Sequence, residues 1–175
     1  MKEYIHGGDI YRHPDVLDYS ANINPLGTPP GVIRAAKDSM ERVCHYPDAC
    51  QEKLKQALAE YEQVPVEWLI CGNGAAELIF ALVQAVKPKR ALVLAPTFAE
   101  YAQALEAVGC EVNREILKKE DGFTLQDRIL DRLQKEDLQM VFLCNPNNPT
   151  GILMDPKLLR KIVTLCEKRQ IYLVV

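Results

Sequence analysis

Apolar segments of two different periods alternate along the second half of the chain, and this alternation constrains the fold more than any other feature. Short continuous apolar runs predict strands buried on both faces, whereas apolar residues at every third or fourth position predict helices. The order predicts an α/β three-layer sandwich with a mostly parallel sheet. Strands are expected at Arg90 to Ala95, Cys110 to Leu117, Gln139 to Cys144 and Ile171 to Val175, and helices at Ala99 to Val108, Leu125 to Gln134 and Asp155 to Arg169.

The first part of the chain has a different character. Residues 1–45 are dense in turn formers and predict an arm with one short helix after Pro30. An amphipathic helix from Gln51 to Gln63, a short strand from Trp68 to Cys71 and an apolar helix from Ala75 to Val86 are expected to follow. In the last helix of the chain, the residues expected to face inward are Leu158, Leu159, Ile162, Val163 and Cys166.

The final apolar run, Ile171 to Val175, lacks the loop and helix that should follow a parallel strand. Strands of such sheets carry their chemistry just past their carboxyl ends. We therefore expect a truncated domain.

Composition argues against several classes of function. Of the 175 residues, 48% are hydrophobic and 26% are charged, which suits one domain core. The net charge of -3, with basic residues scattered among acids, argues against nucleic-acid binding. No apolar run reaches the roughly 20 residues that span a bilayer, and the start lacks a signal peptide's apolar stretch. We expect a cytoplasmic protein without a membrane partner.

The six cysteines form no C-x-x-C pair, and the three histidines are not clustered. Neither a metal site nor a redox motif is therefore expected. Cys71, Cys144 and Cys166 lie inside or beside apolar runs, so core packing is a better interpretation for them than nucleophilic catalysis.

Three junctions before helices carry residue types that together suit a flat, phosphorylated heteroaromatic ligand. Gly72 to Glu77 offers free N–H groups to an anion at a helix start, although such a turn alone is often only a turn. Phe98 could stack on a planar ligand or act as a hydrophobic staple for its helix. Cys144 to Gly151 is a proline-rigid loop that presents asparagine amides at a strand end, where open α/β sheets bind ligands.

A nucleotide-binding fold of the Rossmann type is a weaker interpretation. The glycines after residue 71 lack the spacing of that fingerprint, and they also lack the lysine of a P-loop. An acidic residue should stand at a strand end about 20 residues further on, and Ala91 to Ala95 offers none.

Three motifs resemble a known family: the asparagine loop from Asn145 to Gly151, Gly72 to Glu77, and Tyr46-Pro47-Asp48. They are similar to the fold type I pyridoxal-phosphate enzymes, specifically the histidinol-phosphate aminotransferase group. The resemblance covers nearly the whole chain and implies pyridoxal 5′-phosphate as cofactor. It implies an N-terminal arm with part of a small domain at residues 1–45, and the N-terminal part of the cofactor-binding large domain at residues 46–175.

Cofactor contacts follow from the resemblance residue by residue. Gly74, Ala75 and Ala76 would hold the cofactor phosphate. Phe98 would stack on the pyridine ring. Asn148 would bind the phenolic oxygen of the ring and lie against the substrate.

Contacts with the substrate and with a second subunit are implied in the same way. Tyr46 would reach the cofactor phosphate of the partner in a homodimer with a shared active site. His6 and Gly7 would contact the phosphate of a phosphorylated amino acid, and Asn22 another part of it. A lone histidine in a terminal arm is otherwise usually solvated.

The resemblance also implies groups that the chain lacks. The family's aspartate for the pyridine nitrogen follows the strand that ends here at Val175, and its Schiff-base lysine lies farther on. The cofactor is an electron sink only when those groups support it. No catalytic residue is assigned, and the 175-residue chain by itself is expected to be inactive.

Within the group, the chain is most similar to enzymes that decarboxylate L-threonine O-3-phosphate to (R)-1-aminopropan-2-yl phosphate in cobalamin biosynthesis. The segments that carry this likeness are His6-Gly7-Gly8, Tyr19 to Gly27 and Phe98 to Tyr101. Two alternatives stay open: transamination of histidinol phosphate or a similar amino acid, and a non-catalytic fragment.

Overall fold

The structure is a computed structural model that describes residues 7–175. The chain divides into two compact units, the first ending at Leu69 and the second running from Ile70 to Val175. The helices of the first unit are α1 (Pro30–Ser39), η1 (Met40–Arg42), α2 (Glu52–Glu62) and η2 (Val66–Trp68). The helix expected after Pro30 and the helix expected from Gln51 to Gln63 are therefore confirmed.

The strand expected from Trp68 to Cys71 is wrong. A 3-10 turn, η2, ends at Trp68, and residues 69–71 pair with no strand in the described part of the chain. Leu69 has extended backbone angles, but Ile70 is 76% exposed. Extended conformation makes a strand only where a neighbour supplies the hydrogen-bond ladder, and a short apolar run does not reveal that neighbour.

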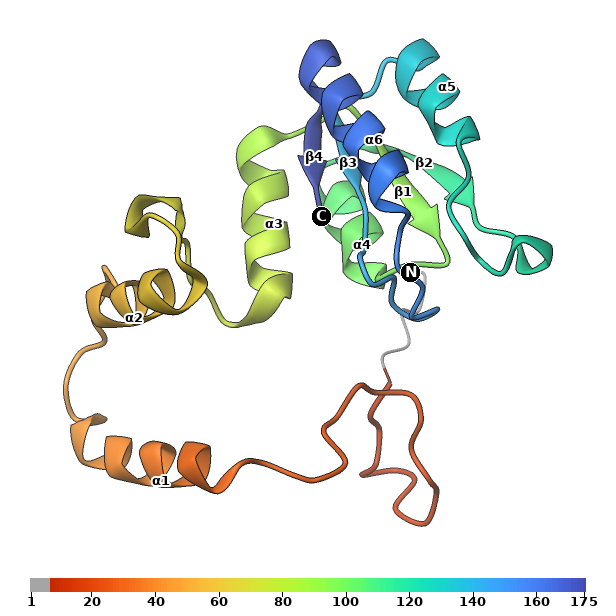
Figure 1. Cartoon of the computed structure of the whole chain (residues 1–175). Helices are drawn as coiled ribbons and strands as arrows, with labels where there is room; N and C mark the ends of the chain where they lie inside the picture. Colours follow the sequence, from red (N-terminus) through yellow and green to blue (C-terminus); the bar gives the residue numbers. More distant parts are fainter. Residues whose placement is uncertain (1–6) are drawn as a thin grey trace. The chain divides into compact units, whose positions relative to one another are not determined.

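The second unit contains a four-stranded parallel sheet in the order β2-β1-β3-β4 (Figure 1). Its strands are β1 (Arg90–Ala95), β2 (Glu111–Ile116), β3 (Met140–Phe142) and β4 (Tyr172–Val174). In register, Ala91 lies opposite Val112 of β2 and Met140 of β3. The parallel sheet and its four strands confirm the fold predicted from the alternating pattern.

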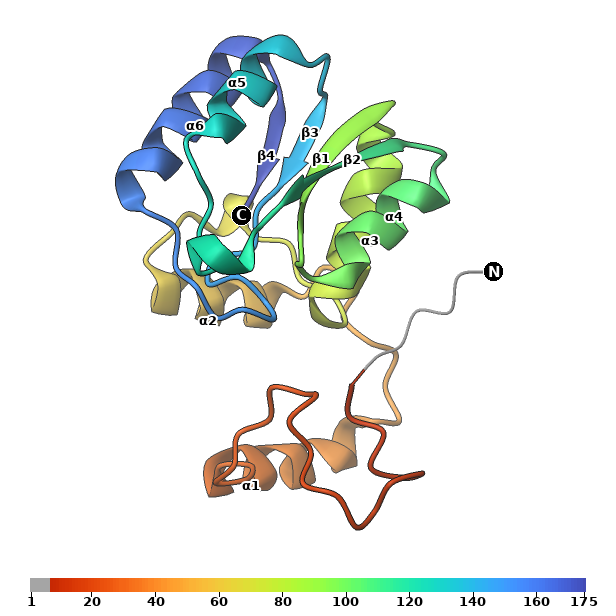
Figure 2. The ribbon, with the colours of Figure 1, turned by 90° about the vertical axis from the view of Figure 1, so that its right-hand side faces the viewer.

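Helices cover both faces of this sheet (Figure 2). They are α3 (Gly74–Val86), α4 (Ala99–Ala107), α5 (Arg128–Lys135) and α6 (Pro156–Arg169), and a short turn, η3 (Lys119–Asp121), precedes α5. One face carries α3 and α4, and the other carries α5 and α6. The helix α6 begins after Asp155, whose Oδ1 accepts the N–H of Lys157 at 2.8 Å, with Pro156 at the first helical position.

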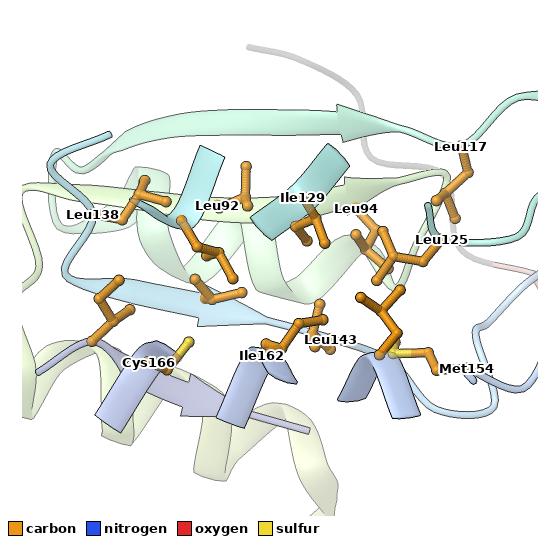
Figure 3. Packing of buried hydrophobic residues seen from close by; sticks show 14 residues of the cluster. Leu92, Leu94, Leu117, Leu125, Ile129, Leu138, Leu143, Met154, Ile162 and Cys166 are labelled. Atoms are coloured by element: carbon orange, nitrogen blue, oxygen red, sulfur yellow. The ribbon is translucent and has the colours of Figure 1, made fainter. Parts of the chain in front are cut away.

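Alternate residues of β1 supply the two cores. Leu92 and Leu94 face α5 and α6 (Figure 3), whereas Ala91 and Val93 face α3 and α4. Because both faces are buried, the strand is continuously apolar rather than alternating.

Within α6 the expected inward face is only partly correct. Leu158, Ile162 and Cys166 are buried, and Leu159 is half-buried. Val163 is 47% exposed, so its expected inward position is wrong. Buried residues repeat here at every fourth position, and Val163 lies beside that stripe on the helix surface.

Glu115, on the edge strand β2, is a buried carboxylate that joins β2 to α5. Its two oxygens contact Arg128 Nε at 2.5 Å and Arg132 Nη1 at 3.0 Å. Both guanidinium groups also donate to backbone carbonyls of β2, at Ile116 and Arg114. The charge is thus paired and hydrogen-bonded, as a buried carboxylate requires.

Candidate functional site

Three of the predicted junctions lie at one end of the second unit (Figure 1). Strands β1 and β3 are parallel neighbours, so their carboxyl ends share one edge of the sheet. Only residues 87–89 connect α3 to β1, which makes helix and strand antiparallel and brings the start of α3 to the same end. This is the edge where open α/β sheets bind ligands.

Asn147 ties two of these junctions together. Its side chain is 3% exposed and makes three hydrogen bonds. Nδ2 donates to the carbonyl oxygen of Pro96 at 3.1 Å and to Thr150 Oγ1 at 2.9 Å, and Oδ1 accepts the hydroxyl of Thr97 at 2.9 Å. Sequence reasoning did not single out Asn147, because its partners beyond Thr150 lie some 50 residues away along the chain.

Cys144 makes two hydrogen bonds within the same loop. It is half-buried and packs against the core under α3 and α4, as expected, and its thiol donates to the carbonyl oxygen of Pro146 at 3.3 Å. The sulfur also accepts the main-chain N–H of Asn148 at 3.3 Å. Cys166, by contrast, is buried in the core as expected.

The two side chains predicted to contact a planar ligand are both half-buried. Asn148 has its main-chain N–H bound to Cys144, while its side-chain amide has no hydrogen-bond partner in the described part of the chain. Phe98 immediately precedes α4 and meets the ring of Tyr101 edge-on, with centroids 5.5 Å apart and planes at 79°. This contact supports the helix start, as a staple would, and leaves part of the Phe98 ring exposed.

The start of α3 provides donors for an anion. Gly74 has a φ of 82°, which favours glycine. Among the described residues, no acceptor receives the N–H groups of Ala75 and Ala76, and neither methyl side chain can shield them. The carboxylate of Glu77 already accepts the N–H of Asn73. Free N–H groups and the positive end of the helix dipole therefore remain for a phosphate.

The residue types at this end of the unit fit the cofactor that the resemblance implies. Unpaired N–H groups at Ala75 and Ala76 suit a phosphate, the half-exposed ring of Phe98 suits a pyridine face, and the unpaired amide of Asn148 suits a phenolic oxygen.

The remaining predicted contacts lie in the first unit. Asn22 and Tyr46 are exposed, Tyr46 at 93%. A Cβ on Gly7 would lie 1.9 Å from the carbonyl oxygen of Ser20, so only glycine permits this approach of the two segments. His6 lies outside the described residues. The roles of these four residues stay predictions.

Tyr101 links the Phe98 junction to the core. Its ring stacks on Phe142 with centroids 4.7 Å apart and planes at 20°. Burial raises the pKa of Tyr101 to about 12, and the nearby groups of Cys144 and Glu100 add to the rise. The phenol is therefore neutral over the physiological range of pH.

We expect this shift to make stability depend on alkaline pH. The folded pKa of Tyr101 is higher than its ordinary value of 10.0, so the stability it contributes is complete below pH 10 and is lost as the pH rises to about 12. In urea unfolding across this range, the free energy of unfolding should fall more steeply for the unmodified chain than for Tyr101→Phe, which keeps the other tyrosines. Equal slopes would contradict the assignment.

No group of three or more His, Cys, Asp or Glu side chains in residues 7–175 could hold a metal ion. None of the helices in this range is both long enough and apolar enough to cross a membrane.

The chain is similar to known proteins in sequence. A sequence profile for "Aminotransferase class I and II" matches residues 14–175. Threonine-phosphate decarboxylase of Salmonella typhimurium is 46% identical over 97% of this chain and 48% of its own length. The adenosylcobalamin biosynthesis bifunctional protein CobDQ of Leptospira interrogans is 34% identical, over 90% of this chain and 20% of its own length.

A solved structure extends the likeness to the fold. The histidinol-phosphate aminotransferase of Clostridium acetobutylicum superposes with a TM-score of 0.77 at 26% identity, over 90% of this chain and 46% of that one. The chain spans about half the length of the relatives it matches, or less.

Proposed function

We propose, because the chain belongs to the aminotransferase class I and II family, that the complete protein decarboxylates L-threonine O-3-phosphate with pyridoxal 5′-phosphate as cofactor. The product would be (R)-1-aminopropan-2-yl phosphate. The observation that carries the proposal is the 46% identity, over 97% of the chain, to an enzyme named for this activity. The 34% likeness to an adenosylcobalamin biosynthesis protein supports a role in cobalamin biosynthesis.

Enzymes of this family depend on pyridoxal 5′-phosphate, which when bound draws electrons from the amino acid into its ring. In this chain the N–H groups of Ala75 and Ala76, with Gly74, would bind its phosphate. Phe98 would hold one face of the ring and exclude water from it. The Asn148 amide would donate to the phenolic oxygen and so orient the ring in its plane.

Substrate contacts would come from the N-terminal arm. His6 and Gly7 would bind the substrate phosphate, and Asn22 together with Asn148 would orient the remainder. Decarboxylation requires the bond to the carboxylate to stand perpendicular to the ring, whereas transamination requires the bond to hydrogen to do so. Contacts that fix the phosphate of the substrate could therefore select the reaction.

The proposed assembly is a homodimer in the cytoplasm, in which Tyr46 reaches the cofactor phosphate of the partner subunit. Residues 1–45 would belong to an arm and small domain, and residues 46–175 to the cofactor-binding domain. Size-exclusion chromatography with light scattering tests the dimer directly.

Comparing substrates on the complete, cofactor-loaded protein tests the activity. L-Threonine O-3-phosphate should be consumed without any oxo-acid acceptor, and histidinol phosphate should not be a substrate. Unphosphorylated L-threonine should have a kcat/KM lower by about 10²-fold or more, because groups built for the phosphate would be left unpaired. Turnover that requires an oxo acid and releases no carbon dioxide would replace the proposal with an aminotransferase.

A further inference from the structure

The loops that follow β1 and β3 carry the proposed contacts with the cofactor ring. Beyond the ends of these strands, hydrogen bonds of one side chain connect the two loops. Ladder pairing between β1 and β3 ends at Val93 and Phe142. In the described part of the chain, the hydrogen bonds between residues 96–98 and residues 145–151 all run through the side chain of Asn147. Phe98 lies on the first of these loops and Asn148 on the second.

The nitrogen and the oxygen of the Asn147 side-chain amide both take part in this connection. Asn147 is buried, and it binds the hydroxyl of Thr97 and the carbonyl of Pro96 on one loop and the hydroxyl of Thr150 on its own. Its main chain closes the second loop as well, since the N–H donates to the carbonyl of Ile152 at 2.9 Å and the carbonyl accepts the N–H of Gly151 at 2.6 Å. An asparagine amide bonded in this way has one orientation.

We propose that Asn147 is a positioning residue that sets the spacing between the ring of Phe98 and the amide of Asn148. The proposal rests on the proposed function for the identity of the ligand, but the connection itself is a property of the chain alone. Asn147 would not touch the ligand; it would act by holding two contact residues in the arrangement that the ligand needs. Binding then avoids the cost of ordering two independent loops.

Thr97→Val is the sharpest test, because it removes one hydroxyl from the connection and keeps the shape of the side chain. The binding probe is pyridoxamine 5′-phosphate, which lacks the aldehyde and cannot react with lysines. Calorimetric titration of the complete protein should show about tenfold weaker binding for Thr97→Val, because the ligand must then order two loops that this hydrogen bond no longer holds together. Thr97→Ser, which keeps the hydroxyl, should bind as the unmodified chain does.

A double substitution separates an indirect role from a direct one. If Thr97 acts through Asn147, then adding Thr97→Val to Asn147→Ala should weaken binding no further than Asn147→Ala alone. Additive losses would instead mean that Thr97 contacts the ligand itself, and the proposal would fail. Asn113→Ala is the matched control, since Asn113 is half-buried and donates to Glu136 at 3.0 Å on another part of the sheet.

Hydrogen exchange provides a readout without any ligand. In Thr97→Val the hydrogen-bonded amides of Asn147, Asn148 and Gly151 should exchange about tenfold faster, although the substitution lies some 50 residues away. Asn113→Ala should leave them unchanged. Unchanged exchange in Thr97→Val would show that Asn147 does not hold the two loops together. This result does not depend on whether Asn147→Ala folds. If the unmodified protein did not bind pyridoxamine 5′-phosphate, the proposed function would fail, while the exchange result would still decide the connection.

Discussion

Replacing Asn148 by alanine in the complete protein is expected to lower kcat/KM about 10- to 100-fold. The side-chain amide has no partner in the described part of the chain, so its removal strands no buried group. The expected loss is that of a hydrogen bond to a charged ligand oxygen, about 1.5–3 kcal/mol. The main-chain N–H of residue 148 would still donate to Cys144, so the loop should keep its form.

The stability of the Asn148→Ala protein decides how that loss is interpreted. Urea unfolding in the absence of cofactor should give a free energy of unfolding within about 0.5 kcal/mol of the unmodified value. Pyridoxamine 5′-phosphate should bind more weakly in parallel with the fall in kcat/KM. An unchanged kcat/KM would remove Asn148 from the site, and a matching loss of stability would make its role structural.

Replacing Phe142 by alanine is expected to lower the free energy of unfolding by about 3–5 kcal/mol. Phe142 is fully buried on β3, between β1 and β4, and its ring stacks on Tyr101. Alanine would leave a cavity in the core under α3 and α4 and would remove the support of the Tyr101 ring.

Val163→Ala is the matched control for Phe142→Ala. Val163 is 47% exposed on α6, so truncating it should change stability by no more than about 0.5 kcal/mol. Urea unfolding at neutral pH measures both variants. A cost below about 1 kcal/mol for Phe142→Ala would show that the packing around β3 is not as tight as the structure indicates.

The alternation of apolar runs was sufficient to predict the sheet because burial on both faces leaves a distinctive local pattern. Arg90 to Ala95 was predicted to the residue, since all its central side chains are buried. The run from Trp68 to Cys71 has a similar apolar character, yet a strand needs a hydrogen-bonded neighbour that a local pattern does not contain. Val163 shows the corresponding limit for helices, where one step of 100° separates a buried position from an exposed one.

The parts of the candidate site that could be predicted are those where a single residue type after a strand suggests a ligand contact, such as an aromatic ring or an amide. Phe98 and Asn148 lie on the loops that follow β1 and β3, and the structure leaves both partly accessible. Asn147 could not be found in this way, because its hydrogen bonds to Pro96 and Thr97 span some 50 residues and depend on β1 and β3 being neighbours. Of the three side-chain partners of Asn147 in the described part of the chain, one is local: Thr150, three residues on, which orients the amide.

The fate of the substrate carboxyl carbon distinguishes decarboxylation from transamination. L-Threonine O-3-phosphate labelled at that carbon should be supplied to the complete protein with pyridoxal 5′-phosphate. The label should leave as carbon dioxide while the amino group stays in an aminopropanol phosphate. Label retained in an oxo acid, with the amino group transferred to an acceptor, would contradict the proposed decarboxylation.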